Sequence, residues 1–300
     1  MEGTRCGYVA LVGAPNAGKS TLLNQLVGAK IAIVSPKVQT TRARVTAIAL
    51  EDMSQIIFVD TPGIFNPSRR LEKAMVDAAW SGAEDADRIA LIIDAVKGLT
   101  KDVRRIIDGL KKNNRRAHII LNKIDLLKRD KLLGLAQALS DEGIFDEIFM
   151  ISALNGDGVA DFRKTLAGEM PEGPWLYPED QLALAPMRQL AAEVTREKLF
   201  LRLNQELPYS LTVETESWEE KKDGSVRIQQ VIFVSRANHK PIVLGKGGQT
   251  IKKIGAMARE ELEESLGCRV HLFLFVKVRE KWLDDPERYR EMGLDFPKDK

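Results

Sequence analysis

The sequence predicts an α/β domain, in which helices cover both faces of a mixed, mostly parallel sheet, followed by a smaller α+β domain. From Tyr8 onward, short runs rich in Val and Ile alternate with helix-length amphipathic stretches, as is typical of a parallel sheet wrapped by helices. The alternation stops at residues 170–174, where two prolines and a glycine interrupt both periods. We therefore place the first domain at residues 1–170, a linker at 171–185, and the second domain with a C-terminal tail at 186–300.

Each element is assigned from its hydrophobic period. The strands expected in the first domain are residues 8–12, 45–50, 55–59, 88–93, 118–121 and 147–151. The helices expected between them are residues 19–27, 70–81, 102–112, 131–140 and 159–166. The second domain is expected to contain a helix at 187–204, strands at 210–218 and 226–234 joined by a turn at Asp223-Gly224, two short helical segments flanking 245–248, and a strand at 269–278.

The composition excludes several classes of protein. With 44% apolar and 29% charged residues, the chain is neither disordered, collagenous nor a coiled coil. Its 45 Lys and Arg residues against 43 Asp and Glu give a formal charge of +2, so any nucleic-acid site must be local. Cys6 and Cys268 support neither a disulfide framework nor a zinc site. Because no apolar run is long enough to span a membrane and the N-terminus lacks a secretory pattern, we expect a cytoplasmic protein.

The segment between the first strand and the first helix has the pattern of a phosphate-binding loop, GAPNAGKS at residues 13–20. Gly13 and Gly18 allow the backbone to curl so that successive amides point at a polyphosphate, and the following helix adds its positive N-terminal end. Lys19 is expected to reach the outer phosphates, and the Ser20 hydroxyl to hold Mg²⁺. This pattern at a strand–helix junction predicts nucleotide binding.

Three later segments indicate which nucleotide is bound. Residues 60–63, DTPG, end a strand where an aspartate can hold magnesium through water and a glycine amide can meet a terminal phosphate. Residues 122–125, NKID, end another strand at the edge where ligands of open α/β sheets bind. The Asp125 carboxylate can accept from both N–H donors of guanine, whereas adenine presents no such pair. Residues 152–154, SAL, supply a small backbone position beside the base, so four loops are expected to meet at one guanine nucleotide.

Together with residues 39–42, QTTR, these segments resemble the motifs of the Ras-like GTPases, and more narrowly those of the Era family. In the second domain, residues 244–252, LGKGGQTIK, look like the GxxG segment of a type II KH RNA-binding domain. The resemblance covers essentially the whole chain. It implies that Thr41, with Thr40 as the second choice, joins the magnesium shell only when a γ-phosphate is present. It also makes Asn16 similar to an asparagine through which some relatives bind K⁺, although a turn-forming role is equally open.

The motifs and the resemblance define the expected site. Its catalytic residues are Lys19, Thr41 and Gly63, and its Mg²⁺ ligands are Ser20, Thr41 and Asp60, with K⁺ at Asn16 as a further candidate cofactor. The nucleotide-binding residues are Gly13, Ala14, Pro15, Asn16, Ala17, Gly18, Lys19, Ser20, Thr21, Asp60, Thr61, Pro62, Gly63, Ile64, Asn122, Lys123, Ile124, Asp125, Ser152, Ala153 and Leu154. Because Ile64 stands where many Ras-like enzymes have a glutamine that orients the attacking water, we expect slow unaided hydrolysis.

The second domain carries a local positive charge. Between residues 224 and 259 there are seven basic residues and no acidic one. In a KH domain the GxxG turn lets the sugar-phosphate backbone pass close to two helix N-termini. The expected RNA-binding residues are Arg236, Lys240, Gly245, Lys246, Gly247, Gly248, Lys252 and Lys253. Residues 231–234 and 242–244 are candidates to line the groove. The alternative to an RNA-binding GxxG segment is a simple turn with a solvated basic helix face.

The sequence therefore predicts a GTP-binding and hydrolysing switch protein that binds single-stranded RNA. The Era resemblance implies that this RNA lies near the 3′ end of small-subunit ribosomal RNA and that the protein assists small-subunit assembly. Order and disorder of residues 33–44 would form the switch. Two alternatives are open: a metabolic P-loop NTPase, and a constitutive RNA-binding protein with a structural nucleotide. We expect a monomer whose partners are GTP or GDP and the small ribosomal subunit, and leave open a weak peripheral association with the inner face of the cell membrane.

Overall fold

The computed structural model of the chain describes residues 3–35, 37, 40–42, 44–204, 207–280, 282 and 285–297. Gln39 of the motif at residues 39–42, part of the expected switch and the end of the tail at Lys300 lie outside the described residues. The chain divides into two compact units. Unit 1 consists of residues 1–32, 41–184 and 290–300, and unit 2 of residues 33–40 and 185–289. Within the described part of the chain, no helix combines the length and the apolar character needed to cross a membrane.

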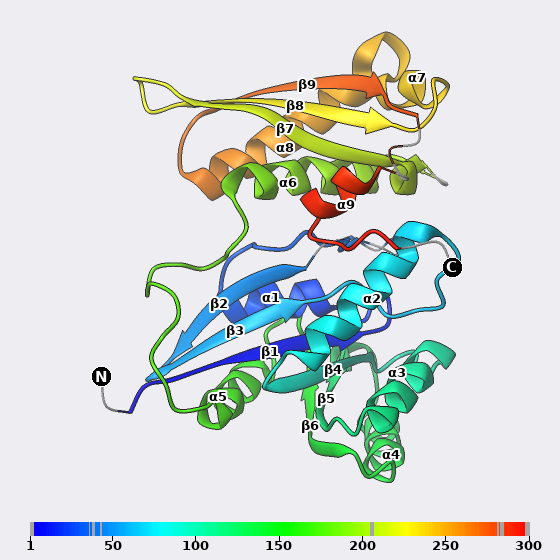
Figure 1. Cartoon of the computed structure of the whole chain (residues 1–300), viewed down its shortest axis with the longest axis vertical. Helices are drawn as coiled ribbons and strands as arrows, with labels where there is room; N and C mark the ends of the chain where they lie inside the picture. Colours follow the sequence, from blue (N-terminus) through cyan, green and yellow to red (C-terminus); the bar gives the residue numbers. More distant parts are fainter. Residues whose placement is uncertain are drawn as a thin grey trace. The chain divides into compact units, whose positions relative to one another are not determined.

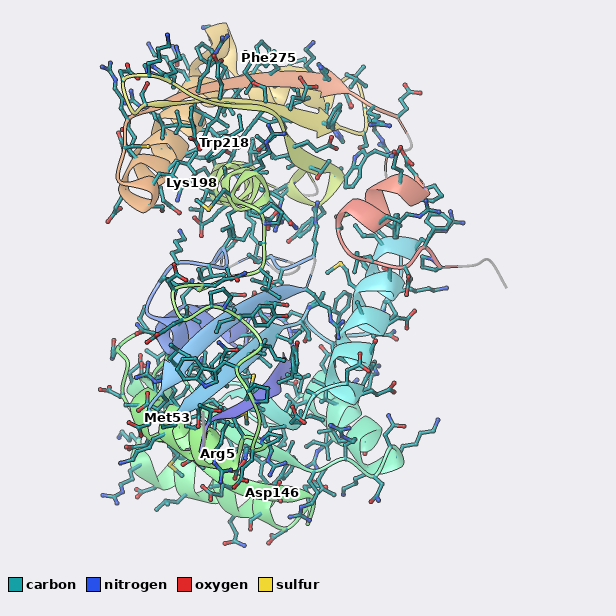
Figure 2. All side chains as sticks on the ribbon, turned by 60° about the vertical axis from the view of Figure 1, so that its left-hand side comes forward. Arg5, Met53, Asp146, Lys198, Trp218 and Phe275 are labelled. Carbon is teal, nitrogen blue, oxygen red and sulfur yellow. The ribbon has the colours of Figure 1, made fainter. Side chains whose placement is uncertain are left out.

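The sheet of unit 1 has the strand order β2-β3-β1-β4-β5-β6 (Figure 1). β2 is antiparallel to β3, and the other neighbouring strands are parallel. The strands are β1 (Arg5–Gly13), β2 (Val45–Glu51), β3 (Ser54–Asp60), β4 (Arg88–Asp94), β5 (Ala117–Asn122) and β6 (Phe145–Ile151). All seven residues of β3 are buried, as expected for a strand covered on both faces. The predicted mixed, mostly parallel sheet is thus confirmed.

Helices cover both faces of this sheet. α1 and α5 pack on one face, and α2, α3 and α4 pack on the other. Their bounds, with a short 3₁₀ helix η1, are α1 (Lys19–Val27), α2 (Arg70–Glu84), α3 (Lys101–Lys112), η1 (Ile124–Leu126), α4 (Arg129–Ser140) and α5 (Val159–Glu169). The start of α3 shows how the sequence sets a boundary, because Thr100 caps the helix by accepting from the Val103 amide at 3.3 Å.

This strand order brings the motifs to one edge. β1 lies between β3 and β4, so the phosphate loop that follows β1 is at the point where the strand order reverses. The carboxyl ends of β1, β3, β4 and β5 are Gly13, Asp60, Asp94 and Asn122. Because ligands of open α/β sheets bind outside the carboxyl ends of the strands at such a point, a ligand site is expected at this edge.

Residues 176–184 run beside β2 and β3. The side-chain oxygen of Gln55, which is fully buried, accepts from the amides of Leu176 at 2.9 Å and Tyr177 at 3.1 Å. Further along, the amide of Ile48 donates to the carbonyl oxygen of Leu182 at 2.9 Å, and the amide of Leu184 donates to the carbonyl oxygen of Thr46 at 3.1 Å. These bonds cover the outer edge of β2.

Unit 2 contains a three-stranded sheet of order β7-β8-β9, with α6 and α8 packed on one face (Figure 1). β7 and β8 are antiparallel, and β8 and β9 are parallel. The elements are α6 (Met187–Arg202), η2 (Leu207–Ser210), β7 (Leu211–Glu220), β8 (Val226–Val234), α7 (His239–Leu244), η3 (Lys246–Gly248), α8 (Gln249–Leu266), β9 (Val270–Val278) and α9 (Pro286–Glu291). This is the predicted order of helix, two strands, two helices and strand, so the smaller α+β domain is confirmed.

One element of unit 2 is longer than the sequence analysis proposed. The helical segment after the glycines was expected to be short, which is wrong, because α8 has 18 residues. Ile254, Ala258 and Leu262 repeat every fourth residue and are buried, so the apolar face continues past Gly255. The helix ends only at Gly267, which has a φ of +64°.

Candidate functional site

The phosphate loop runs from Gly13 to Gly18 between β1 and α1. A Cβ atom at Gly13 would lie 2.5 Å from the carbonyl oxygen of Ile92, and one at Gly18 would lie 2.2 Å from Nδ2 of Asn122. Gly18 also has a φ of +96°, which side-chain-bearing residues disfavour. Both positions therefore require glycine, and the backbone of the loop is bare enough for a ligand to approach its amides.

Lys19 begins α1 and is only 6% exposed. Its Nζ donates to the carbonyl oxygens of Gly13 at 3.3 Å and Ala14 at 3.2 Å, so the ammonium group lies inside the curl of the loop. Burial lowers the pKa of Lys19, and the negative charge of Asp60 opposes this in part. An anion beside the loop would stabilise this buried ammonium group, and a polyphosphate supplies such a charge.

Three oxygen-bearing side chains from different segments meet beside the loop. Ser20 Oγ lies 2.7 Å from Oδ2 of Asp60 and 2.9 Å from Oγ1 of Thr41, which is itself 3.4 Å from the same carboxylate oxygen. Asp60 is fully buried, and its second oxygen, Oδ1, has no hydrogen-bond partner. Burial raises the pKa of Asp60, while Lys19 and the bonds from the two hydroxyls lower it. A set of hard oxygen donors with one unpartnered buried carboxylate oxygen fits Mg²⁺.

Residues 60–64 are fixed against the phosphate loop. The amide of Ile64 donates to the carbonyl oxygen of Gly13 at 3.1 Å. A Cβ atom at Gly63 would come within 3.1 Å of Pro15, so the two loops pass close together there. The Ile64 side chain is fully buried in the core shared with α2 and α3, where it offers no polar group to a water molecule.

The loop expected to read the base follows β5. Nδ2 of Asn122 donates to the carbonyl oxygen of Ala17 at 2.9 Å, and Oδ1 accepts from the amide of Ala153 at 2.9 Å. One side chain therefore joins the phosphate loop to the loop after β6. Ser152 Oγ donates to Oδ1 of Asp125 at 2.6 Å, which orients the carboxylate.

Two predicted residues contribute no side chain to this group. Leu154 is 74% exposed, and Ile124 packs against the core behind the loop. Thr61 instead holds the strand end, because its hydroxyl donates to the carbonyl oxygen of Leu11 at 2.9 Å. The other predicted nucleotide-binding residues belong to the loops already described or, for Lys19, Ser20 and Thr21, to the first turn of α1.

Sequence reasoning missed Asp94. Its Oδ2 accepts from Nζ of Lys123 at 2.6 Å, and the same Nζ donates to the carbonyl oxygen of Asn16 at 2.9 Å. The position of Asp94 was a usable signal, because it ends β4 at the same sheet edge as Asp60 and Asn122.

In unit 2, the turn after α7 is built for glycine. Gly245 has a φ of +73°, and a Cβ atom there would lie 2.1 Å from Oγ1 of Thr250. Gly247 and Gly248 have φ values of +59° and +75°, with open space around them. The basic residues expected to bind RNA are all exposed: Arg236, Lys240, Lys246, Lys252 and Lys253. An exposed positive surface around bare backbone suits a phosphate chain.

The apolar residues suggested for the groove separate into core and surface. Val231, Ile232, Val234 and Val243 are fully buried in unit 2. Ile242, on α7, is 55% exposed. Of these five side chains, only that of Ile242 is accessible to a ligand.

Comparison with known proteins gives the family. Residues 8–123 match the family described as 50S ribosome-binding GTPase, and residues 206–283 match the KH domain. The chain is 60% identical over 296 residues to GTPase Era of Bradyrhizobium diazoefficiens, covering 99% of this chain and 96% of that protein. It is 62% identical over 295 residues to GTPase Era of Sinorhizobium medicae, covering 98% and 95%. The chain belongs to the Era family of GTPases.

Two solved Era structures have the same fold. One is an Era variant of Aquifex aeolicus bound to GDP·AlF₄⁻, with a TM-score of 0.91, 40% identity, and 97% of this chain and 99% of that chain covered. The other, with the same values, is Era in complex with MgGDPNP and nucleotides 1506–1542 of 16S ribosomal RNA. The resemblance to the Era family and the order of a G domain followed by a KH domain are thus confirmed.

In this member of the Era family, the described residues between 33 and 40 belong to unit 2. The amide of Val34 donates to Oε1 of Glu197 on α6 at 2.7 Å. Arg196, the preceding residue of α6, donates to the carbonyl oxygen of Thr40. These contacts could not be predicted from the sequence, because the partners are 163 and 156 residues apart and no motif marks them.

The two adjacent threonines of the family motif have different surroundings. Thr40 Oγ1 donates to the carbonyl oxygen of Lys37 at 2.8 Å, and the Lys37 ammonium donates to two backbone carbonyls at the end of α6. Thr41 Oγ1 instead lies beside Ser20 and Asp60. This geometry favours Thr41 over Thr40 as a magnesium ligand, a role that stays a prediction.

Proposed function

We propose that this chain binds and hydrolyses GTP at the carboxyl edge of the unit 1 sheet and binds single-stranded RNA on the GxxG surface of unit 2. Asp125 carries the proposal: its carboxylate is oriented by Ser152, in a loop that Asn122 joins to the phosphate loop. Likeness to an Era structure holding MgGDPNP and 16S ribosomal RNA supports both halves. On this basis the RNA lies near the 3′ end of small-subunit ribosomal RNA, and the protein assists small-subunit assembly.

Calorimetric titration with GDPNP and with the matching adenosine analogue tests the nucleotide half. The guanosine analogue should bind at least about 100-fold more tightly, since each hydrogen bond to a charged group contributes about 1.5–3 kcal/mol. Equal affinities would contradict guanine recognition and favour a metabolic P-loop NTPase.

The residues of the site have separate tasks in hydrolysis. Lys19 and the amide of Gly63 stabilise negative charge on the terminal phosphate as water attacks. Ser20, Thr41 and Asp60 would hold Mg²⁺, which would supply positive charge to neutralise the phosphates. Because the buried side chain of Ile64 cannot orient the water, unaided hydrolysis is slow.

The proposal also includes a K⁺ ion bound beside Asn16. Asn16 lies in the phosphate loop with a φ of +62°, and Lys123 holds its carbonyl oxygen. That fixed backbone supports a defined side-chain position, but a left-handed asparagine is also typical of a simple turn. Hydrolysis rates measured at equal concentrations of K⁺ and Na⁺ separate the two roles. A faster rate in K⁺ supports the cation site, and equal rates support the turn.

The contacts between residues 33–40 and α6 support a route from nucleotide to RNA. Thr41 would respond to the γ-phosphate, and its neighbour Thr40 is bonded to Arg196 of the RNA-binding unit. A switch requires RNA to bind differently in the two nucleotide states. RNA affinity should therefore differ between the GDPNP and GDP complexes, and equal affinities would favour a constitutive RNA-binding protein with a structural nucleotide.

Glu197→Gln tests this route. Weakening the bond to the Val34 amide should reduce the difference in RNA affinity between the two nucleotide states, whereas Glu260→Gln, an exposed change on α8, should leave it unchanged. An unaltered difference in Glu197→Gln would contradict the route.

Location and assembly state are also proposals. We propose a monomer in the cytoplasm with weak peripheral association at the inner face of the membrane. Sedimentation of the pure protein tests whether it is a monomer. Its distribution between soluble and membrane fractions of cells tests its location and its membrane association.

A further inference from the structure

The end of β4 carries a carboxylate outside the four nucleotide loops. Asp94 is 6% exposed. Its Oδ1 accepts from the amide of Val96 at 3.0 Å, and its Oδ2 accepts from Nζ of Lys123 at 2.6 Å. One oxygen thus shapes the turn after β4, while the other holds the lysine of the base-reading loop.

Lys123 is restrained at its backbone and at its side chain. Its φ is +70°, in the left-handed region that a residue with a side chain disfavours. Its Nζ donates to both Asp94 and the carbonyl oxygen of Asn16 in the phosphate loop. Lys123 therefore joins the end of β4 to the phosphate loop. Its positive charge also balances the negative charge of the nearly buried Asp94 carboxylate.

We propose that Asp94 is a positioning residue for the guanine nucleotide: by holding the Lys123 ammonium group, it fixes the loop of residues 122–125 against the phosphate loop. Without the carboxylate, the ammonium group keeps, among the described residues, the neutral carbonyl of Asn16, which attracts it less strongly than a charged partner. The strained backbone at Lys123 then relaxes and shifts Asp125, two residues further on. The inference rests on the proposed guanine site and adds a residue that determines how long the nucleotide stays bound.

The effect falls on nucleotide retention and not on the chemical step. Among the described residues, neither Lys123 nor Asp94 forms a hydrogen bond or ion pair with Lys19 or with the three magnesium-site side chains, so the groups around the terminal phosphate keep their geometry. GDP and GTP share the base and the first two phosphates, so both should dissociate faster by the same factor.

The test is a double-mutant cycle on the full chain, with dissociation of fluorescent mant-GDP and mant-GDPNP followed by stopped flow. Asp94→Asn keeps an oxygen for the Val96 amide and removes the charge, and should speed release of both nucleotides about 10-fold. Lys123→Met should also speed release. In the double variant, Asp94→Asn should add little beyond Lys123→Met, because its effect is transmitted through the lysine.

Several controls keep this test decisive. Asp94→Ser, which also keeps an acceptor for Val96, should behave like Asp94→Asn, and single-turnover hydrolysis at saturating GTP should match wild type in both. Glu142→Gln removes a carboxylate bonded to Lys111 elsewhere in the same unit and should leave release unchanged.

An unchanged release rate in both Asp94 variants would overturn the inference, as would the full effect of Asp94→Asn persisting in the Lys123→Met background. Failure of the wild-type protein to retain mant-GDP would instead count against the proposed function.

Discussion

The nucleotide edge of unit 1 and the GxxG surface of unit 2 are both suited to anions, but by opposite means. At the nucleotide edge, Lys19, Asp60 and Asn122 are each at most 6% exposed, and hydrogen bonds within the protein fix their positions. Around the GxxG turn the basic side chains are exposed, and Gly247 and Gly248 have open space beside them. The first region recognises a ligand by geometry, whereas the second attracts one by charge. The first should therefore depend little on salt, and the second strongly.

The largest expected effect concerns geometry at the nucleotide edge. Asp125→Asn should weaken GTP binding at least about 100-fold, because the amide cannot accept both guanine N–H groups as a carboxylate can. It should improve binding of xanthosine triphosphate, whose base offers an oxygen instead of the amino group. Calorimetry with both nucleotides measures this, and Asp141→Asn, at the end of α4, is the control. Unchanged preference for GTP would mean that Asp125 does not read the base.

The second prediction concerns charge on the GxxG surface. Replacing Lys246 and Gly247 by Asp should lower affinity for a single-stranded RNA more than about 10-fold, because phosphate contacts are lost and repulsion is added. GTP binding should not change. Fluorescence anisotropy at several salt concentrations should also show a shallower salt dependence than in wild type. Lys221→Asp, an exposed change elsewhere in unit 2, is the control. RNA affinity retained by the double variant would place the RNA elsewhere.

The third prediction separates the two threonines. Thr41→Val should slow hydrolysis about 10-fold, since one oxygen ligand of Mg²⁺ is lost at a cost of about 1.4 kcal/mol. In the presence of Mg²⁺ it should also weaken the preference for GDPNP over GDP. Thr40→Val is the matched control, because among the described residues that hydroxyl bonds to nearby backbone carbonyls and not to the magnesium-site side chains. Single-turnover kinetics measure both variants. A larger loss in Thr40→Val would reverse the assignment.

The smallest expected effect lies away from both surfaces. The hydrogen bond with Tyr177, with smaller contributions from burial and nearby charges, raises the pKa of Tyr8 to about 12. A raised pKa means that this phenol favours the folded state below its ordinary pKa of about 10, and that the contribution is lost as the pH rises from about 10 to 12.

Tyr177→Phe should therefore lower the pKa of Tyr8 toward its ordinary value. The folded state should then lose less stability as the pH rises. Near-ultraviolet absorbance during alkaline titration follows the phenols, and Tyr209→Phe, in unit 2, is the control. A Tyr8 titration that stays near pH 12 would show that Tyr177 is not the main cause.

Local patterns were sufficient for most of the fold. Buried strand runs such as β3 and the glycines of the phosphate loop are each set by a few consecutive residues, so the sequence predicts them. The length of α8 was underestimated, because its apolar stripe continues past Gly255 and outweighs the cost of that one glycine in the helix.

Contacts between distant segments could not be predicted in this way. Asp94 and Lys123 are 29 residues apart, and Val34 and Glu197 are 163 apart. Such pairs depend on strand order and on helix packing, which no short motif encodes. For the site, the motifs indicated which loops converge, but not the side chains that hold those loops together.

The segment that covers the outer edge of β2 bears on how the molecule can be divided. A fragment ending at residue 170 would keep every nucleotide motif, yet the amide of Ile48 and the carbonyl of Thr46 would lose their partners, and the buried side chain of Gln55 would lose its bonds to Leu176 and Tyr177. A bare strand edge invites pairing with another copy, so such a fragment should tend to self-associate, and one ending after Leu184 should not.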